Sequence, residues 1–272
     1  PPQPAIRDSS LRLVGSEMCI RDRPTFDLTG RVAIITGGSR GIGLAIAKGF
    51  SARGAKVVIS SRKAEACHAA SVEIEAAGGE ALAVGVHMGD REQLSALVDA
   101  TIDRFGRLDI VINNAANALS QPVEHLTADA WDKQLAVNLT GPVFLVHYAL
   151  PHLKNSPSAA VVNVSTVGAF IYSPGMPGYV GAKAAMLAIT RSMAAEFAPY
   201  GVRVNALAPG TFDTDMTRSG GPDAVERMAE LSVAGRVADP DEIVPTVLLM
   251  VSDAGSYING QVFIVDGGYV AH

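Results

Sequence analysis

Short apolar runs alternate with longer amphipathic runs along the chain from about residue 31 onward. The apolar runs are rich in Val, Ile and Ala and show little in/out alternation, which is typical of strands buried on both faces of a parallel sheet. We predict strands at Val32–Thr36, Lys56–Ser60, Ala81–Val86, Leu108–Asn113, Ala159–Val164, Val202–Leu207 and Val262–Val265.

The longer runs between the strands carry apolar residues at helical spacing. We predict helices at Leu44–Phe50, Ala64–Ala77, Arg91–Phe105, Ala128–Leu153, Pro177–Ala198 and Pro240–Val251, and an irregular segment over about 209–235. Strands that alternate with helices indicate an α/β domain, a doubly wound and mainly seven-stranded parallel sheet with helices on both faces. Since no linker or internal repeat interrupts the pattern, we expect residues 26–272 to form one domain.

Composition and charge narrow the class of protein. Apolar residues make up 48% of the 272 positions, enough for a sizeable core, and the net charge of −5 gives no electrostatic reason to expect nucleic acid or an anionic membrane as partner. No uncharged apolar run reaches the roughly 18 residues that span a bilayer. Cys19 and Cys67 have neither metal-like spacing nor a disulfide pattern. We therefore predict no metal site, no membrane span and a cytoplasmic location.

Residues 1 to about 25 differ from the rest of the chain. They carry scattered charges and no apolar core of a signal peptide, so we do not expect a secretory signal. Their sequence resembles translated sequencing-adapter read-through, and an irregular natural extension is the alternative. We expect a disordered or artefactual tail and leave it out of the fold argument.

A glycine-rich turn follows the first predicted strand directly and precedes a helix. The spacing is Gly-x3-Gly-x-Gly, at Gly37, Gly41 and Gly43. Glycines let the backbone approach a ligand, and the free N–H groups and dipole of a helix N-terminus attract a pyrophosphate. We predict a phosphate site formed by Gly37, Ser39, Arg40, Gly41, Ile42 and Gly43.

Tyr179 and Lys183 lie four positions apart in a predicted helix, so both side chains project from the same face. A free tyrosine has a pKa near 10, and a nearby cation lowers that pKa toward the range useful for proton transfer. The pair alone is weak evidence, because the same spacing occurs on many solvated helices.

Several motifs together give this pair a context. From about Phe26 to Tyr269 the chain resembles a short-chain dehydrogenase/reductase of the single-domain type, which implies a Rossmann-like fold. The motifs are Thr36 to Gly43, Asn113-Asn114-Ala115-Ala116, Asn138, Tyr179-x3-Lys183 and Pro209-Gly210. The resemblance implies that Tyr179 is the general acid/base, that Lys183 holds the nicotinamide ribose, and that Asn138 binds a water linking Lys183 to solvent. It also implies cofactor contacts at Met88, Asn114, Ala115, Ala116, Pro209, Gly210 and Thr211.

The residue that donates a hydroxyl to the substrate has two candidates. The family usually has a serine 13 positions before the tyrosine, which falls on Thr166 here, with Ser165 beside it. Gly168 stands one position earlier than the glycine of the family pattern, so Ser165 remains an alternative. If the strand continues through them, successive residues point to opposite faces, and only one of the two can serve. We favour Thr166, whose hydroxyl can donate the same hydrogen bond.

Cofactor choice depends on the end of the second strand. NAD-binding proteins often carry a carboxylate there, which accepts from the ribose 2′-hydroxyl. This chain has Ser60-Ser61-Arg62-Lys63 instead, and Arg40 adds a second guanidinium. Arg62 and Lys63 could be ordinary solvated charges, but cations at a helix start oppose the helix dipole. We predict that Ser61 and Arg62 bind NADP(H), with NAD(H) possible.

Two positions depart from the family pattern. His87-Met88 stands where Asp-Val is frequent, and Ala116 replaces the usual glycine of Asn-Asn-Ala-Gly. Neither change removes a reacting group.

We predict an NADP(H)-dependent oxidoreductase that interconverts a ketone or aldehyde with an alcohol. Apolar residues before Tyr179 and after Gly210 suggest a small apolar substrate beneath a lid at about 209–235; they are Phe170, Ile171, Tyr172, Met176, Phe212 and Met216. A 3-oxoacyl-thioester reductase and a non-catalytic NADP-binding protein remain alternatives. The closing segment 262–268 resembles the family's subunit interface and implies a homotetramer.

Overall fold

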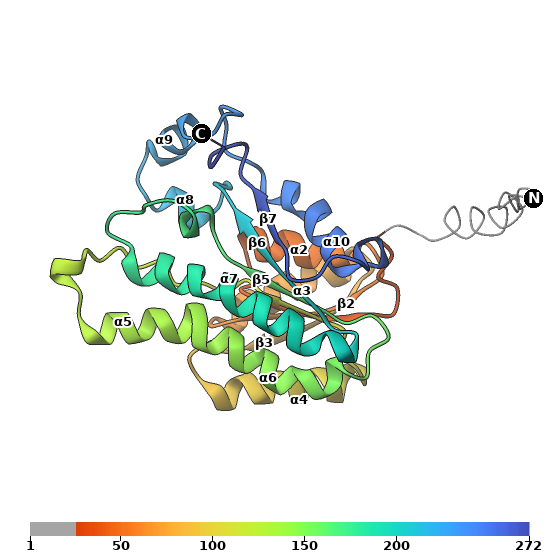
Figure 1. The fold of residues 1–272 in the computed structure, drawn as a ribbon. Coiled ribbons are helices and arrows are strands. Elements are labelled where there is room, and N and C mark those ends of the chain that lie inside the picture. The colour runs from red at the N-terminus through yellow and green to blue at the C-terminus, as the bar shows by residue number, and fades with distance from the viewer. Residues whose placement is uncertain (1–25, 272) are drawn as a thin grey trace, which may run out of the picture.

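A seven-stranded parallel sheet forms the centre of the molecule in a computed structural model that describes residues 26–271 (Figure 1). The predicted tail over residues 1–25 lies outside the described residues. The strand order is β3-β2-β1-β4-β5-β6-β7, and every pairing is parallel. The predicted α/β fold is therefore confirmed. The strands are β1 (Val32–Thr36), β2 (Lys56–Ser61), β3 (Glu80–Gly85), β4 (Ile110–Asn113), β5 (Ala160–Val164), β6 (Arg203–Pro209) and β7 (Val262–Val265).

Helices cover both faces of the sheet because both faces of its strands are apolar. Ala33 and Ile35 of β1 point into one buried cluster, and Val32 and Ile34 point into the other. The first cluster is covered by α2 (Gly41–Ser51), α3 (Ala64–Ala76) and α10 (Val244–Val251). The second is covered by α4 (Arg91–Phe105), α6 (Gly141–Leu153) and α7 (Pro177–Phe197). Within residues 26–271, the remaining α-helices are α5 (Ala128–Leu135), α8 (Asp215–Arg218) and α9 (Ala224–Glu230).

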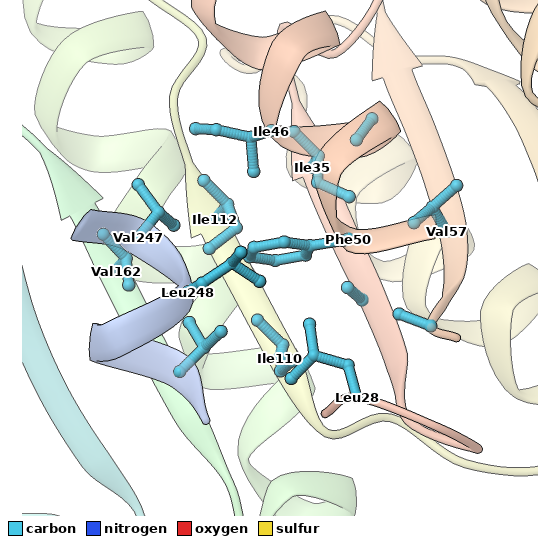
Figure 2. Close-up of a cluster of buried hydrophobic side chains, with 14 of the residues drawn as sticks. Leu28, Ile35, Ile46, Phe50, Val57, Ile110, Ile112, Val162, Val247 and Leu248 are labelled. Atoms are coloured by element: carbon cyan, nitrogen blue, oxygen red, sulfur yellow. The ribbon is translucent and has the colours of Figure 1, made fainter. Parts of the chain in front are cut away.

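Phe50 anchors α2 on the sheet. Its ring is fully buried and lies between β4 and α10, close to Ile110, Ile112 and Leu248 (Figure 2). Burying a phenylalanine side chain contributes about 1.5–3 kcal/mol. This packing fixes the C-terminal end of α2 on the sheet, while its N-terminus follows the carboxyl end of β1, where the phosphate site is predicted.

The strand order reverses between β1 and β4, and hydrogen bonds join the ends of these two strands at that point. The Thr36 hydroxyl accepts hydrogen bonds from the backbone N–H groups of Asn114 (3.0 Å) and Ala115 (3.1 Å). The Asn114 amide donates to the Thr36 carbonyl at 2.9 Å. Ligands of open α/β sheets bind in the crevice beside such a reversal. The turns after β1 and β4 therefore lie where a ligand of this fold is expected to bind.

The helix predicted over Ala128–Leu153 is not a single α-helix. A π-helical turn, Ala136–Thr140, separates α5 from α6. Pro142 lies four residues after Asn138 and has no N–H to donate to the Asn138 carbonyl, so the α-helical hydrogen bond cannot form there. A π-turn adds one residue to the helical ring and is frequent at functional sites. The widened turn carries Asn138.

The segment predicted to be irregular over 209–235 contains regular structure. Pro209 is the last residue of β6 and pairs with Val265, where its missing N–H is not needed. Two short helices follow, α8 and α9, and they lie near the C-terminus (Figure 1). The prediction failed because both helices have fewer than two full turns, too few for a helical period to be recognised.

Candidate active site

Tyr179 and Lys183 lie in the first turns of α7, as their spacing predicts. Lys183 is only 2% exposed, and its ammonium donates to the Val164 carbonyl at 2.6 Å. The ammonium is 6.0 Å from the centroid of the Tyr179 ring. The cation is thus buried beneath the phenol and fixed to the end of β5.

The two candidate hydroxyls face different partners. The Ser165 side chain is buried and donates to the Lys183 carbonyl at 2.9 Å, which ties β5 to α7. The Thr166 side chain forms a hydrogen bond with Tyr179 and accepts from the Gly168 N–H at 3.2 Å. Thr166 rather than Ser165 therefore lies beside the phenol.

The pKa values of the pair differ from the sequence-based expectation. Burial raises the pKa of the Tyr179 phenol, and the hydrogen bond from Thr166 offsets part of that effect. Burial also lowers the pKa of Lys183 to about 8. The expectation that Lys183 lowers the pKa of Tyr179 is not met by the protein groups alone, because desolvation is the larger effect on both residues.

Lys183→Met should remove a pH dependence of stability. Below pH 8, Lys183 is protonated in both folded and unfolded chains, and the burial penalty is fully present. Between pH 8 and about 10.5 the folded chain binds fewer protons than the unfolded chain, so the free energy of unfolding should rise, by about 3 kcal/mol in all. Urea titrations of both proteins across this range would measure it. Lys48→Met, at a half-exposed lysine, is the control and should keep the rise.

Asn138 is fully buried and clamps a neighbouring loop. Its amide oxygen accepts from the Asn117 N–H at 2.9 Å, and its amide nitrogen donates to the Asn117 carbonyl at 2.7 Å. Asn117 was not among the predicted site residues. Its role is invisible in sequence because the two residues are 21 positions apart.

The glycine-rich turn has the geometry of an anion site. Gly37 and Gly41 adopt positive φ angles of 65° and 54°. A Cβ on Gly43 would lie 2.3 Å from the Gly37 carbonyl oxygen, so no larger residue fits. The α2 N-terminus has no side-chain cap, which leaves its first N–H groups available to an anion. Ile42 is the second residue of α2 and is partly buried against the core.

The ends of β1 and β2 bring hydroxyls and cations together. Ser39 donates to the Ser61 hydroxyl at 3.1 Å, and the Gly38 N–H donates to the Ser60 carbonyl at 3.2 Å. Arg62 and Lys63 follow as exposed residues without an ion-pair partner among residues 26–271. Arg40, in contrast, is paired with Asp215 at 3.0 Å. We call the site formed by Ser39, Ser61 and Arg62 the cradle. The end of β2 was predicted to lack a carboxylate, yet Asp215 of α8 brings one near this cradle.

The other predicted cofactor residues differ in which atoms they could present to a cofactor. The Met88 side chain is buried in the core, so only its main chain could meet a cofactor. Gly210 has room for no side chain, because a Cβ would lie 2.6 Å from the Asp266 Cα. The main-chain carbonyl of Thr211 accepts from the Ala238 N–H. Pro209 and the turn residues Asn114, Ala115 and Ala116 lie at the ends of β6 and β4.

Thr214 is a site neighbour that sequence reasoning missed. A Cβ on Gly41 would lie 3.1 Å from the Thr214 methyl carbon, so this residue rests against the glycine-rich turn. Its hydroxyl accepts from the Thr217 N–H and caps α8. The signal in the sequence was a threonine in front of an acidic first turn, a usual helix start.

The apolar residues suggested as substrate walls are only partly available. Tyr172 is 90% exposed, and Phe170 and Met216 are about half exposed. Ile171 and Met176 are partly buried. Phe212 is 3% exposed and belongs to the core, so its assignment to a wall was wrong.

Comparisons with known proteins agree with this fold. A family model described as Enoyl-(Acyl carrier protein) reductase matches residues 37–270. A 3-oxoacyl-[acyl-carrier-protein] reductase from Synechocystis is 37% identical and covers 89% of this chain and 98% of its own length. Human dehydrogenase/reductase SDR family member 4 is 34% identical over 96% of this chain and 93% of its own length.

A solved structure shares the fold as well. It is a putative NAD(P) dependent gluconate 5-dehydrogenase from Beutenbergia cavernae with bound NADP, at low occupancy. It superimposes with a TM-score of 0.86 at 32% identity, over 92% of this chain and 100% of that one.

The chain therefore belongs to the short-chain dehydrogenase/reductase family. It is an NAD(P)-dependent oxidoreductase of the kind that acts on CH–OH groups. Within residues 26–271, none of the helices is both long and apolar enough to cross a bilayer.

Proposed function

We propose that this protein is an NADP(H)-dependent oxidoreductase that interconverts a small ketone or aldehyde with the corresponding alcohol. The observation that carries the proposal is the hydrogen bond between Thr166 and Tyr179 above the buried Lys183. Two hydroxyls that point to one spot can bind the same carbonyl oxygen. A fixed cation below them supports negative charge on that oxygen or on the phenol.

Each of the three residues has a distinct task in this proposal. Thr166 donates a hydrogen bond to the substrate oxygen and orients the carbonyl. Tyr179 gives its phenol proton to that oxygen during reduction and takes a proton from the alcohol during oxidation. Lys183 holds the nicotinamide ribose and places a positive charge beneath the phenol, 6.0 Å from the ring centroid. Among the protein groups it is Thr166 that offsets the burial raising the pKa of Tyr179.

The nicotinamide cofactor supplies or accepts the hydride. The residues present fit it, since Gly37, Gly41 and Gly43 leave room for a close backbone approach and α2 offers uncapped N–H groups. Ser39, Ser61 and Arg62 would bind the ribose 2′-phosphate, and Lys183 the nicotinamide ribose. Main-chain atoms of Met88, Asn114, Ala115, Ala116, Pro209, Gly210 and Thr211 would complete the site.

Asn138 would serve proton exchange through its main chain rather than its side chain. The side-chain amide is engaged by Asn117 on both atoms. Its carbonyl has no α-helical donor because Pro142 occupies that position. We propose that this carbonyl accepts from a water that links Lys183 to solvent.

A 3-oxoacyl-thioester reductase is the second candidate within the same mechanism. The observation in its favour is the relative of that name from Synechocystis, matched at 37% identity over nearly its whole length. The partly exposed Phe170 and Met216 would suit either an acyl chain or a small apolar carbonyl. A non-catalytic NADP-binding protein would need no Thr166–Tyr179–Lys183 cluster, so we place it last.

Three further proposals accompany this function. We propose a cytoplasmic location, a homotetramer with 262–268 at a subunit interface, and a substrate lid formed by 209–235. The lid proposal rests on α8 and α9, which follow the carboxyl end of β6, at the sheet edge where the crevice lies.

A carbonyl panel tests the function. Purified protein is mixed with NADPH or NADH and with cyclic ketones, aldehydes and 3-oxoacyl thioesters, and oxidation of the cofactor is followed by absorbance. Turnover of at least one carbonyl, faster with NADPH, is the expected result. The most active class selects between the two catalytic candidates. Cofactor binding without turnover of any carbonyl would support the non-catalytic protein.

Arg62→Gln should weaken NADPH binding about tenfold and leave NADH binding nearly unchanged, because a charge-assisted bond to the 2′-phosphate is lost. Fluorescence titration of the cofactor measures both dissociation constants. Arg53→Gln, at an exposed arginine just beyond the C-terminus of α2, is the matched control. Equal losses for both cofactors would remove Arg62 from the 2′-phosphate site.

A further inference from the structure

The segment after β6 touches the glycine-rich turn at two successive residues. Thr214 lies against Gly41, and Asp215 accepts a hydrogen bond from the Arg40 guanidinium at 3.0 Å. Both charged side chains are well exposed, at 71% and 68%. Among residues 26–271, Asp215 is the ion-pair partner of Arg40. The contact joins positions 175 apart in the chain.

This ion pair lies beside the cradle proposed for the 2′-phosphate. Ser39 immediately precedes Arg40 and hydrogen-bonds to Ser61, which in turn precedes Arg62. A 2′-phosphate in the cradle would accept from the fork of Arg40, whose donors match phosphate oxygens. The Asp215 carboxylate already occupies part of that fork and carries the same sign of charge as the phosphate. Carboxylate and phosphate therefore compete for one cation.

We propose that Asp215 is a specificity-determining residue that lowers the preference for NADP(H) by holding Arg40. NADP(H) must displace the carboxylate to engage Arg40, whereas NAD(H) has no 2′-phosphate and leaves the pair intact. The inference rests on the proposed function, because it takes the Ser39–Ser61 cradle as the 2′-phosphate site. One substitution should be enough to change the preference between NADP(H) and NAD(H), because exposed ion pairs are individually weak.

Asp215→Asn is the test, with dissociation constants for NADPH and NADH measured by direct titration. We expect NADPH to bind about three- to tenfold more tightly and NADH to bind as in the wild type. The gain should shrink as NaCl is raised from about 0.05 to about 0.5 M. Glu226→Gln removes a charge from the neighbouring α9 without touching Arg40 and should change neither constant.

Arg40→Gln completes a double-mutant cycle with Asp215→Asn. In that background Asp215→Asn should improve NADPH binding by less than about twofold, because the competed cation is absent. An equal gain for both cofactors, or a full gain in the Arg40→Gln background, would overturn the inference. So would an unchanged NADPH constant in the single variant.

The outcome is separable from that of the proposed function. Binding titrations need no carbonyl, so a protein that binds NADPH but reduces nothing loses the proposed activity and still reports on Asp215. Conversely, the wild type could show NADPH-dependent turnover while Asp215→Asn leaves the NADPH dissociation constant unchanged. That result would retain the proposed function and reject the inference. Failure of the wild type to bind either cofactor would overturn both.

Discussion

Tyr179→Phe should reduce kcat by roughly 10^2- to 10^4-fold with the best carbonyl, the range lost when a positioned general acid is removed. Phenylalanine keeps the shape of the ring and loses only the hydroxyl group, and with it the hydrogen bond with Thr166. NADPH binding should stay close to that of the wild type. Steady-state kinetics and cofactor titration on the same preparation give both values.

Tyr200→Phe is the matched control for that experiment. This tyrosine lies just after α7, is half-exposed and is not part of the proposed machinery. It should retain wild-type kcat. Activity that survives Tyr179→Phe would reject the phenol as the proton donor and with it the proposed mechanism.

Thr166→Val should lower kcat by about 10^2- to 10^3-fold, the usual loss when one donor to a developing oxyanion is removed. Valine replaces the hydroxyl by a methyl group of similar size, so the end of β5 should keep its packing. Thr166→Ser retains the donor and should recover most of the activity. Rates of NADPH oxidation for the three proteins decide the matter.

Ser165→Ala separates a structural hydroxyl from a catalytic one. Ser165 donates to the Lys183 carbonyl rather than to the phenol, so its loss should lower the free energy of unfolding by about 1 kcal/mol and leave kcat nearly unchanged. The reverse pattern, with the large loss of kcat in Ser165→Ala and little in Thr166→Val, would assign the substrate hydroxyl to Ser165.

The sequence was sufficient to predict a feature wherever the residues that form it lie close together in the chain. The apolar run of β1, the glycines after it and the start of α2 are contiguous, so the strand, the turn and the helix could be predicted together. Tyr179 and Lys183 share a helix face by spacing alone. The parallel sheet followed from strands that are apolar on both faces, because only helices on each side can cover them.

The surroundings of those residues depended on contacts between distant segments. Spacing identified Lys183, yet the depth at which it is buried, and hence the lowered pKa, comes from the packing of α7 on β5. Asn138 was found as a motif residue, whereas its clamp on Asn117 requires the loop after β4 to fold back. Asp215 could not be connected with Arg40, because the two are remote in sequence and meet only across the crevice.

The Thr166 and Ser165 alternative shows the same division most clearly. By itself the sequence determined that hydroxyl-bearing residues follow β5, that Tyr179 and Lys183 lie on one helix face, and that a glycine-rich turn precedes α2. Only the tertiary structure decided which hydroxyl faces the phenol and that burial dominates the pKa values of Tyr179 and Lys183. The reason is physical: spacing sets the direction of a side chain within its own element, while hydrogen-bond partners and desolvation are set by the elements packed against it.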